Sequence, residues 1–202
     1  MDISYCEVDD IKNAMPDTVW TDTYDSQLSS FCVRASRLID TYLRKDPGTF
    51  GVAATSIRYY KARGGSILDV DEMAAAPTEV AVMEDGTNYT VWASTDYILW
   101  PYNALAMGLP YTRLIIDLLH GTKSVWYTYE RGVRITAKFG FSTIVPEDIK
   151  MATIVQTIRW FKRAMQGFQD TGAITELYQL QYTRKLDPEV ELILNGFERI
   201  AI

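Results

Sequence analysis

Residues 133–168 read VRITAKFGFSTIVPEDIKMATIVQTIRWFKRAMQGF, and this stretch alone predicts a strand, a turn and a long helix. Apolar and polar side chains alternate at its start, which is the pattern of a half-buried β-strand. Gly140 and Pro146 then mark the turn, since proline lacks the N–H of a ladder and suits the first helical turn. The apolar face of the predicted strand consists of Val133, Ile135, Ala137 and Phe139.

The helix that follows is predicted from the spacing of its apolar residues. Glu147 and Asp148 place negative charge in its first turn, where the helix dipole favours it. Apolar residues then recur at gaps of three and four, which predicts a core-facing stripe, with Gln156 among the polar residues on the outer face. The stripe consists of Met151, Ile154, Ile158, Phe161, Met165 and Phe168.

The composition is that of a soluble globular protein. The chain has 202 residues, of which 48% are hydrophobic and 23% charged, so it can bury one core, or one core with a lobe. There is no run of about 18 apolar residues and no basic-then-apolar start, so neither membrane insertion nor secretion is expected. Cys6 and Cys32 are each expected within a helix, as reduced and buried thiols.

The net charge of −6 argues against a surface that binds nucleic acid. The charge is uneven, because residues 1–30 are rich in acidic side chains and residues 31–63 in basic ones. Two interpretations stay open: the solvated faces of neighbouring helices, or complementary rims of a self-assembling protein. The second interpretation would use Asp9 and Asp10 against Arg34 and Arg37.

Residues 1–46 are predicted to form a helix pair. Ser4 and Glu7 match a capping box, and the first helix ends before Pro16. The second helix is expected to be capped by Thr23 or Asp25.

Residues 47–142 form a predicted β lobe, because short Val-, Ile- and aromatic-rich segments alternate with turn residues. These segments are SIRYYK, SILDV, TEVAVME, YTVWAS, DYILW, RLIID, SVWYTY and VRITAKF.

Two connections within the lobe are predicted from their turn residues. Asp85 and Gly86 indicate a hairpin, since they tolerate positive backbone angles. The loop between Pro101 and Pro110 is expected to cross between strand layers.

Residues 143–202 are expected to complete the helical core with the long helix, an arm and a C-terminal helix. Asp187 and Pro188 suit the N-cap and first position of that last helix. The helix could pack on its own subunit or on another one. The predicted fold is therefore α+β: a helical bundle with an antiparallel β lobe inserted in the middle, as one compact domain with an insertion.

Catalytic patterns are mostly missing. His120 is the only histidine, so a metal site with several imidazoles is excluded, and no phosphate-binding loop is present. Asp69, Asp71 and Glu72 form the best remaining candidate, because alternating carboxylates on a strand could hold Mg²⁺ in a metal-assisted hydrolase. Solvated acids on an exposed strand are the simpler interpretation, and we expect no enzyme activity and no cofactor.

The order of these segments resembles the head-tail connector proteins, also called adaptor or head completion proteins, of tailed bacteriophages and their gene-transfer relatives. The motifs that carry the resemblance are ASRLIDTYL, Asp96-Tyr97, Phe139-Gly140-Phe141 followed by Val145-Pro146, and DPEVELILNGFER. The resemblance covers nearly the whole chain. The chain departs from the shortest, purely helical members in its strand-rich middle, which could serve only to enlarge the ring's outer wall.

The resemblance implies a structural virion protein, assembled in the host cytoplasm and located in the neck. Such proteins form a ring of about twelve copies under the portal protein, extend the DNA channel without binding DNA specifically, and offer a surface to the stopper or tail-completion protein. The family's C-terminal segment commonly reaches the portal. Here that segment would contribute Leu177, Leu186, Val190, Leu194 and Phe197. Besides the hydrolase, the alternative is another neck or tail-completion ring protein that makes no portal contact.

Overall fold

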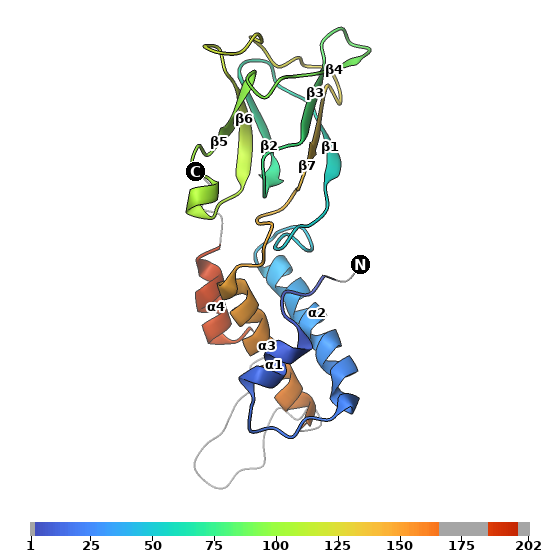
Figure 1. Cartoon of the computed structure of the whole chain (residues 1–202), viewed down its shortest axis with the longest axis vertical. Coiled ribbons are helices and arrows are strands. Elements are labelled where there is room, and N and C mark those ends of the chain that lie inside the picture. The colour runs from blue at the N-terminus through green and yellow to red at the C-terminus, as the bar shows by residue number, and fades with distance from the viewer. Residues whose placement is uncertain (1–2, 166–185, 198–202) are drawn as a thin grey trace. The chain divides into compact units, whose positions relative to one another are not determined.

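The computed structural model describes residues 3–165 and 186–197. The chain divides into a helical unit, Met1–Gly48 with Val145–Ile202, and a β unit, Thr49–Ile144 (Figure 1). The described residues form helices in the first unit and two antiparallel sheets in the second. The predicted α+β class is therefore confirmed.

The helical unit is built around two long helices that pack on each other. They are α2, Asp25–Tyr42, and α3, Glu147–Met165. The short helix α1, Val8–Ala14, contacts both of them, and α4, Pro188–Asn195, packs on α3. A 3₁₀ turn at Asp22–Tyr24 leads directly into α2.

Buried apolar side chains from three helices form the core of this unit. Ile11, Leu28, Cys32, Ile154 and Phe161 belong to it, all with less than a tenth of their surface exposed. The ring of Phe161 also packs against Trp20 and Tyr24, with centroids 5.4 and 5.5 Å away. Burying a side chain of this size contributes about 1.5 to 3 kcal/mol, so this cluster ties α1, α2 and α3 together.

The buried face of α3 differs from the predicted stripe. Ile154 and Phe161 are buried as predicted, but Met151 and Met165 are more than half exposed. Gln156, expected on the outer face, is 1% exposed, and its Oε1 accepts a hydrogen bond from the Asp187 N–H at 3.2 Å. The prediction was wrong because α3 packs on α4 as well as on α2, which makes its buried face wider and partly polar. Phe168 lies outside the described residues.

The N-caps of α1 and α2 differ from the predicted ones. The N-cap of α1 is Glu7, whose N–H donates to Asp10 Oδ2 at 2.9 Å, whereas the Ser4 hydroxyl bonds the Cys6 carbonyl. Cys6 therefore precedes the helix instead of lying in it, although its thiol is buried. The N-cap of α2 is Tyr24, with no side-chain cap, because the 3₁₀ turn continues into the helix.

The β unit consists of two antiparallel sheets (Figure 1). The first has the order β1, β7, β3, β4, with bounds Ser56–Tyr60, Val133–Ala137, Glu79–Met83 and Tyr89–Val91. The second has the order β2, β6, β5, with bounds Ile67–Met73, Tyr111–Ile116 and Tyr97–Trp100.

The inner faces of the two sheets share one core. Val133 and Ile135 of β7 are fully buried, as their alternation predicts, and they pack in the same cluster as Leu114 of β6. Trp92 and Trp126 stack within it, with centroids 4.6 Å apart. Because buried side chains of both sheets belong to one core, the unit is a small β-sandwich.

Two predictions for the lobe were wrong. Residues 124–129 form no strand. The backbone N–H of Trp126 donates to the Gly65 carbonyl and its indole N–H donates to the Ser66 carbonyl, so this segment is held by one residue and not by a strand ladder. The loop from Pro101 to Pro110 joins β5 to β6 within one sheet and does not cross between layers. The predicted hairpin is confirmed between β3 and β4, with Gly86 at φ +79°.

Candidate assembly surfaces

The acidic residues of β2 are held by arginines. Asp69 and Asp71 share the solvent-facing side of the strand, as predicted, but Asp69 pairs with Arg113 and Asp71 with Arg58, each at 2.7 Å. Glu72 lies on the opposite, partly buried side. Across residues 3–165 and 186–197, no group of three or more His, Cys, Asp or Glu side chains could hold a metal. The arrangement does not support a metal-assisted hydrolase.

His120 lies in an exposed turn. Its Nδ1 is 2.9 Å from Asp117 Oδ2, and the same carboxylate accepts the backbone N–H groups of Leu119 and His120. Its side chain is 70% exposed. This is the geometry of a turn that its own aspartate stabilises.

Two of the four charged residues proposed for subunit contacts already have partners in their own chain. Asp10 pairs with Lys150 at 2.8 Å. Arg37 pairs with Asp40 at 2.8 Å and donates to the Ile3 carbonyl. By contrast, Asp9 and Arg34 are exposed, so they are the members of the predicted set that a second copy can reach.

The buried Asp40 carboxylate fixes the N-terminal segment to α2. It accepts hydrogen bonds from the Tyr5 hydroxyl and from the Gly48 N–H at 3.0 Å, besides its ion pair with Arg37. Burial raises the pKa of this carboxyl, against the effect of its hydrogen bonds. Gly48 has φ +78°, and a Cβ there would meet Ile3 at 2.6 Å. This network positions the chain that enters α1, and with it the acidic surface of that helix.

The apolar side of α4 faces its own unit. Leu186, Val190 and Leu194 are each less than a tenth exposed. Asp187 starts the helix, because its Oδ1 accepts the Glu189 N–H at 3.0 Å, and its Oδ2 pairs with Arg159 at 3.1 Å. A role for these apolar side chains at the portal stays a prediction, and it would require α4 to leave α3.

The other predicted portal residues lie elsewhere. Leu177 lies outside the described residues, and Phe197 is half-buried just after α4. The large apolar side chain that α4 does expose is Leu192, at 75%. Sequence analysis missed it because the helical spacing was assigned to a single apolar side.

A second surface that sequence analysis missed is the uncharged segment between Asp96 and Arg113. Its exposed apolar side chains are Ile98, Trp100, Tyr102, Leu105, Met107 and Leu109. Ile98 also lies in register with Ile115, and Ile115 with Ile67, on the outer face of the second sheet. Apolar patches of this kind mark contacts with other molecules. The absence of charged residues from WPYNALAMGLP was the signal in the sequence that could have identified this surface.

Comparison with protein-family models and with curated protein sequences found no match to the chain. Solved structures do match. A chain in the neck of an empty GTA (gene transfer agent) particle, computed with C6 symmetry, aligns with a TM-score of 0.57 and 14% identity, over 96% of this chain and 90% of that one. This chain is similar in fold to a GTA neck protein.

A chain from the neck of a native GTA particle, computed with C12 symmetry, also aligns with this chain. Its TM-score is 0.52 and its identity 16%, over 90% of this chain and 86% of that one. The similarity to neck proteins of gene-transfer particles that the sequence motifs indicated is confirmed at the level of the fold. Within the described residues, no helix has both the length and the apolar character needed to cross a membrane.

Proposed function

We propose that this protein is a structural component of a virion neck, where it forms a ring adaptor between the portal and the stopper and extends the DNA channel. The observation that supports this proposal is the similarity in fold to GTA neck chains. The alignments cover 96% and 90% of this chain, and 90% and 86% of the two neck chains. The alternative hydrolase has no comparable support, because its two aspartates, Asp69 and Asp71, are ion-paired to arginines.

A ring is the assembly that this proposal requires. The matching necks were computed with C6 and C12 symmetry, and twelve copies around a channel fit the second of these. A net charge of −6 suits the wall of such a channel, since an acidic surface repels the phosphates of passing DNA. The ring would belong to the particle, with its subunits made in the host cytoplasm.

The portal contact is assigned to the C-terminal segment, which includes Leu177, Leu186, Val190, Leu194 and Phe197. Because Val190 and Leu194 pack on α3, deleting residues 187–202 would also uncover the helical core. The exposed Leu192 allows a cleaner test, since it can be changed without opening that core.

Leu192→Asp is expected to weaken binding to isolated portals at least about tenfold and to leave the melting temperature unchanged. The reason is that burying a carboxylate in an apolar contact costs more than about 1.4 kcal/mol, and this free energy corresponds to a factor of about ten in affinity. Co-sedimentation of the full chain with portals measures this. Leu119→Asp, at an 83% exposed position in the β unit, is the matched control. Equal portal binding by both variants would contradict the assignment of α4 to the portal. Rings that never bind portals would favour a different position in the neck.

A further inference from the structure

We propose that neighbouring copies in the ring meet through the outer face of α2 on one copy and the acidic surface formed by α1 and the first turn of α3 on the next. The partner is thus a second copy of this chain, and the contact is basic against acidic. This inference rests on the proposed function, because it assigns the surfaces that close the ring.

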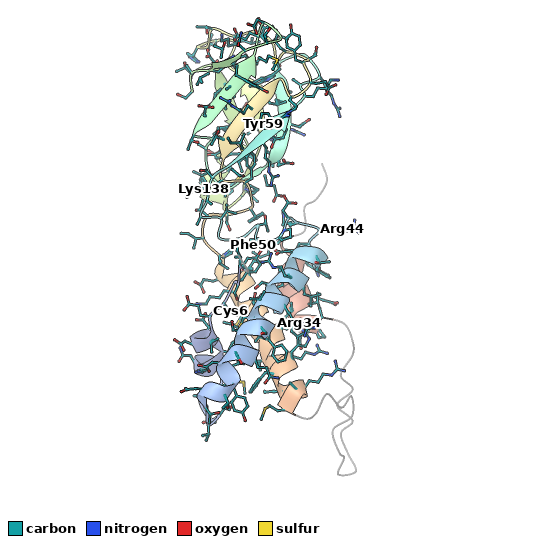
Figure 2. The ribbon with its side chains drawn as sticks, turned by 90° about the vertical axis from the view of Figure 1, so that its right-hand side faces the viewer. Cys6, Arg34, Arg44, Phe50, Tyr59 and Lys138 are labelled. Atoms are coloured by element: carbon teal, nitrogen blue, oxygen red, sulfur yellow. The ribbon has the colours of Figure 1, made fainter. Side chains whose placement is uncertain are left out.

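The basic surface consists of Arg34 on the outer face of α2 and Arg44 in the turn that follows α2. Arg34 and Arg44 are exposed, and no acidic side chain of the described residues lies within ion-pair distance of either one. Figure 2 shows Arg34 midway along α2 and Arg44 just beyond its C-terminal end. The Arg34 guanidinium lies 5.3 Å from the ring centroid of Trp160 on α3, which holds the charge in place without neutralising it.

The complementary surface carries an excess of carboxylates. Its exposed acids come from the start of α1 and the first turn of α3, and they are Glu7, Asp9, Glu147 and Asp148. Two lysines lie beside them, but Lys12 pairs with Asp25 at 2.7 Å and Lys150 pairs with Asp10 at 2.8 Å. That hydrogen bond, followed by the charges of Asp10, Glu147 and Glu7, raises the pKa of Lys150. Glu7 and Glu147 therefore lie near the same lysine, and that lysine is already paired with Asp10.

The two surfaces point in different directions. The segment that leads into α1 lies against Ser36, whose Oγ accepts the Tyr5 N–H at 2.9 Å. Arg34 is two residues from Ser36, which places it about 200° around the helix. Arg34 thus lies on the far side of α2 from the segment that enters α1. Two different, complementary surfaces join copies head to tail, and such contacts close into rings.

Charge reversal on each face tests the contact. In one variant, Arg34→Glu is combined with Arg44→Glu, and in the other Glu7→Lys is combined with Asp9→Lys. Each variant alone is expected to need at least about a tenfold higher concentration to assemble, because two attractive charges in the contact become repulsive. A one-to-one mixture is expected to restore rings, because each reversed face then meets a reversed face and each native face a native one.

Native mass spectrometry and negative-stain microscopy, with and without portals, give the readout, and circular dichroism checks the fold. Arg63→Glu, at an exposed arginine of the β unit, is the matched control and is expected to assemble normally. Normal assembly of both reversed variants, or folded variants whose mixture gives no rings, would overturn this contact and leave the proposed function standing. A wild-type chain that forms no rings even on portals would overturn the proposed function itself.

Discussion

Asp96 is a buried carboxylate that holds two loops of the β unit. Its Oδ1 accepts the Thr122 N–H at 2.8 Å and the Thr122 hydroxyl at 3.0 Å, and its Oδ2 accepts the Ala93 N–H at 3.0 Å. The Thr122 N–H is the main reason that the pKa of Asp96 is lowered, although burial opposes it. Its place in the Asp96-Tyr97 motif is thus explained by loop structure and needs no catalytic role.

A lowered pKa in the folded state gives Asp96 a defined effect on stability against pH. The ionised carboxylate stabilises the fold above its unfolded pKa of about 3.9, and this contribution is lost as pH falls through the lower folded pKa. Asp96→Asn is expected to lower the free energy of unfolding by about 1 to 3 kcal/mol at pH 7, because the Ala93 N–H loses its acceptor.

The difference between wild type and Asp96→Asn should shrink as the pH is lowered from about 5 to 2. Urea unfolding followed by tryptophan fluorescence measures it, since Trp92 and Trp126 are buried in the same unit. Asp69→Asn, which removes an exposed ion pair, is the control and is expected to change the free energy by at most about 1 kcal/mol. A difference between Asp96→Asn and wild type that stays constant across this range would contradict the assigned role.

Single residues of the candidate surfaces were the least predictable from the sequence. Asp10 and Arg37 lie in the charge blocks that the sequence reveals, yet each has an ion-pair partner in its own chain. Lys150 lies on a different helix from Asp10, so packing between helices determines that pair and sequence distance does not indicate it. Asp40 lies three residues after Arg37 on the same helix, so that pair could have been predicted from helical spacing.

In α4, local sequence determines where the helix starts, and packing determines where it docks. Asp187 and Pro188 start this helix as predicted, since an aspartate N-cap and a proline in the first turn are local signals. Its docking on α3 depends further on Asp187, which accepts from Glu189, donates its own N–H to Gln156 and pairs with Arg159. One residue therefore serves both the start of the helix and its position.

Two substitutions separate these roles. Asp187→Asn keeps an N-cap acceptor but removes the charge facing Arg159, whereas Asp187→Ala removes both and is expected to cost about 1 kcal/mol more. Hydrogen exchange of the α4 amides should therefore be fastest in Asp187→Ala, intermediate in Asp187→Asn and slowest in wild type. Equal protection in all three proteins would mean that packing of Val190 and Leu194 alone holds the helix.

Element types were predicted well where the pattern is local and poorly where it depends on neighbours. The alternation in β7 and the Asp85-Gly86 turn predicted a strand and a hairpin that the structure has. Residues 124–129 have strand composition, but Trp126 uses its backbone and indole N–H groups on a neighbouring loop. Gln156 is buried because α4 supplies a donor for its side chain, and no periodicity in α3 could indicate that.

At the scale of the whole molecule, the proposed function depends on the similarity in fold to neck chains of GTA particles. The resemblance noted from motif order and the similarity in fold agree, although identity is only 14% to 16%. The exposed apolar side chains of β5 and the following loop are consistent with the proposed assembly, in which they would contact another molecule.

Electron microscopy of the full chain mixed with isolated portals is the most direct test of the proposed ring. We expect a ring of this protein, coaxial with the portal channel and with cyclic symmetry. A protein that stays monomeric beside unoccupied portals, or that binds them without forming a ring, would contradict it.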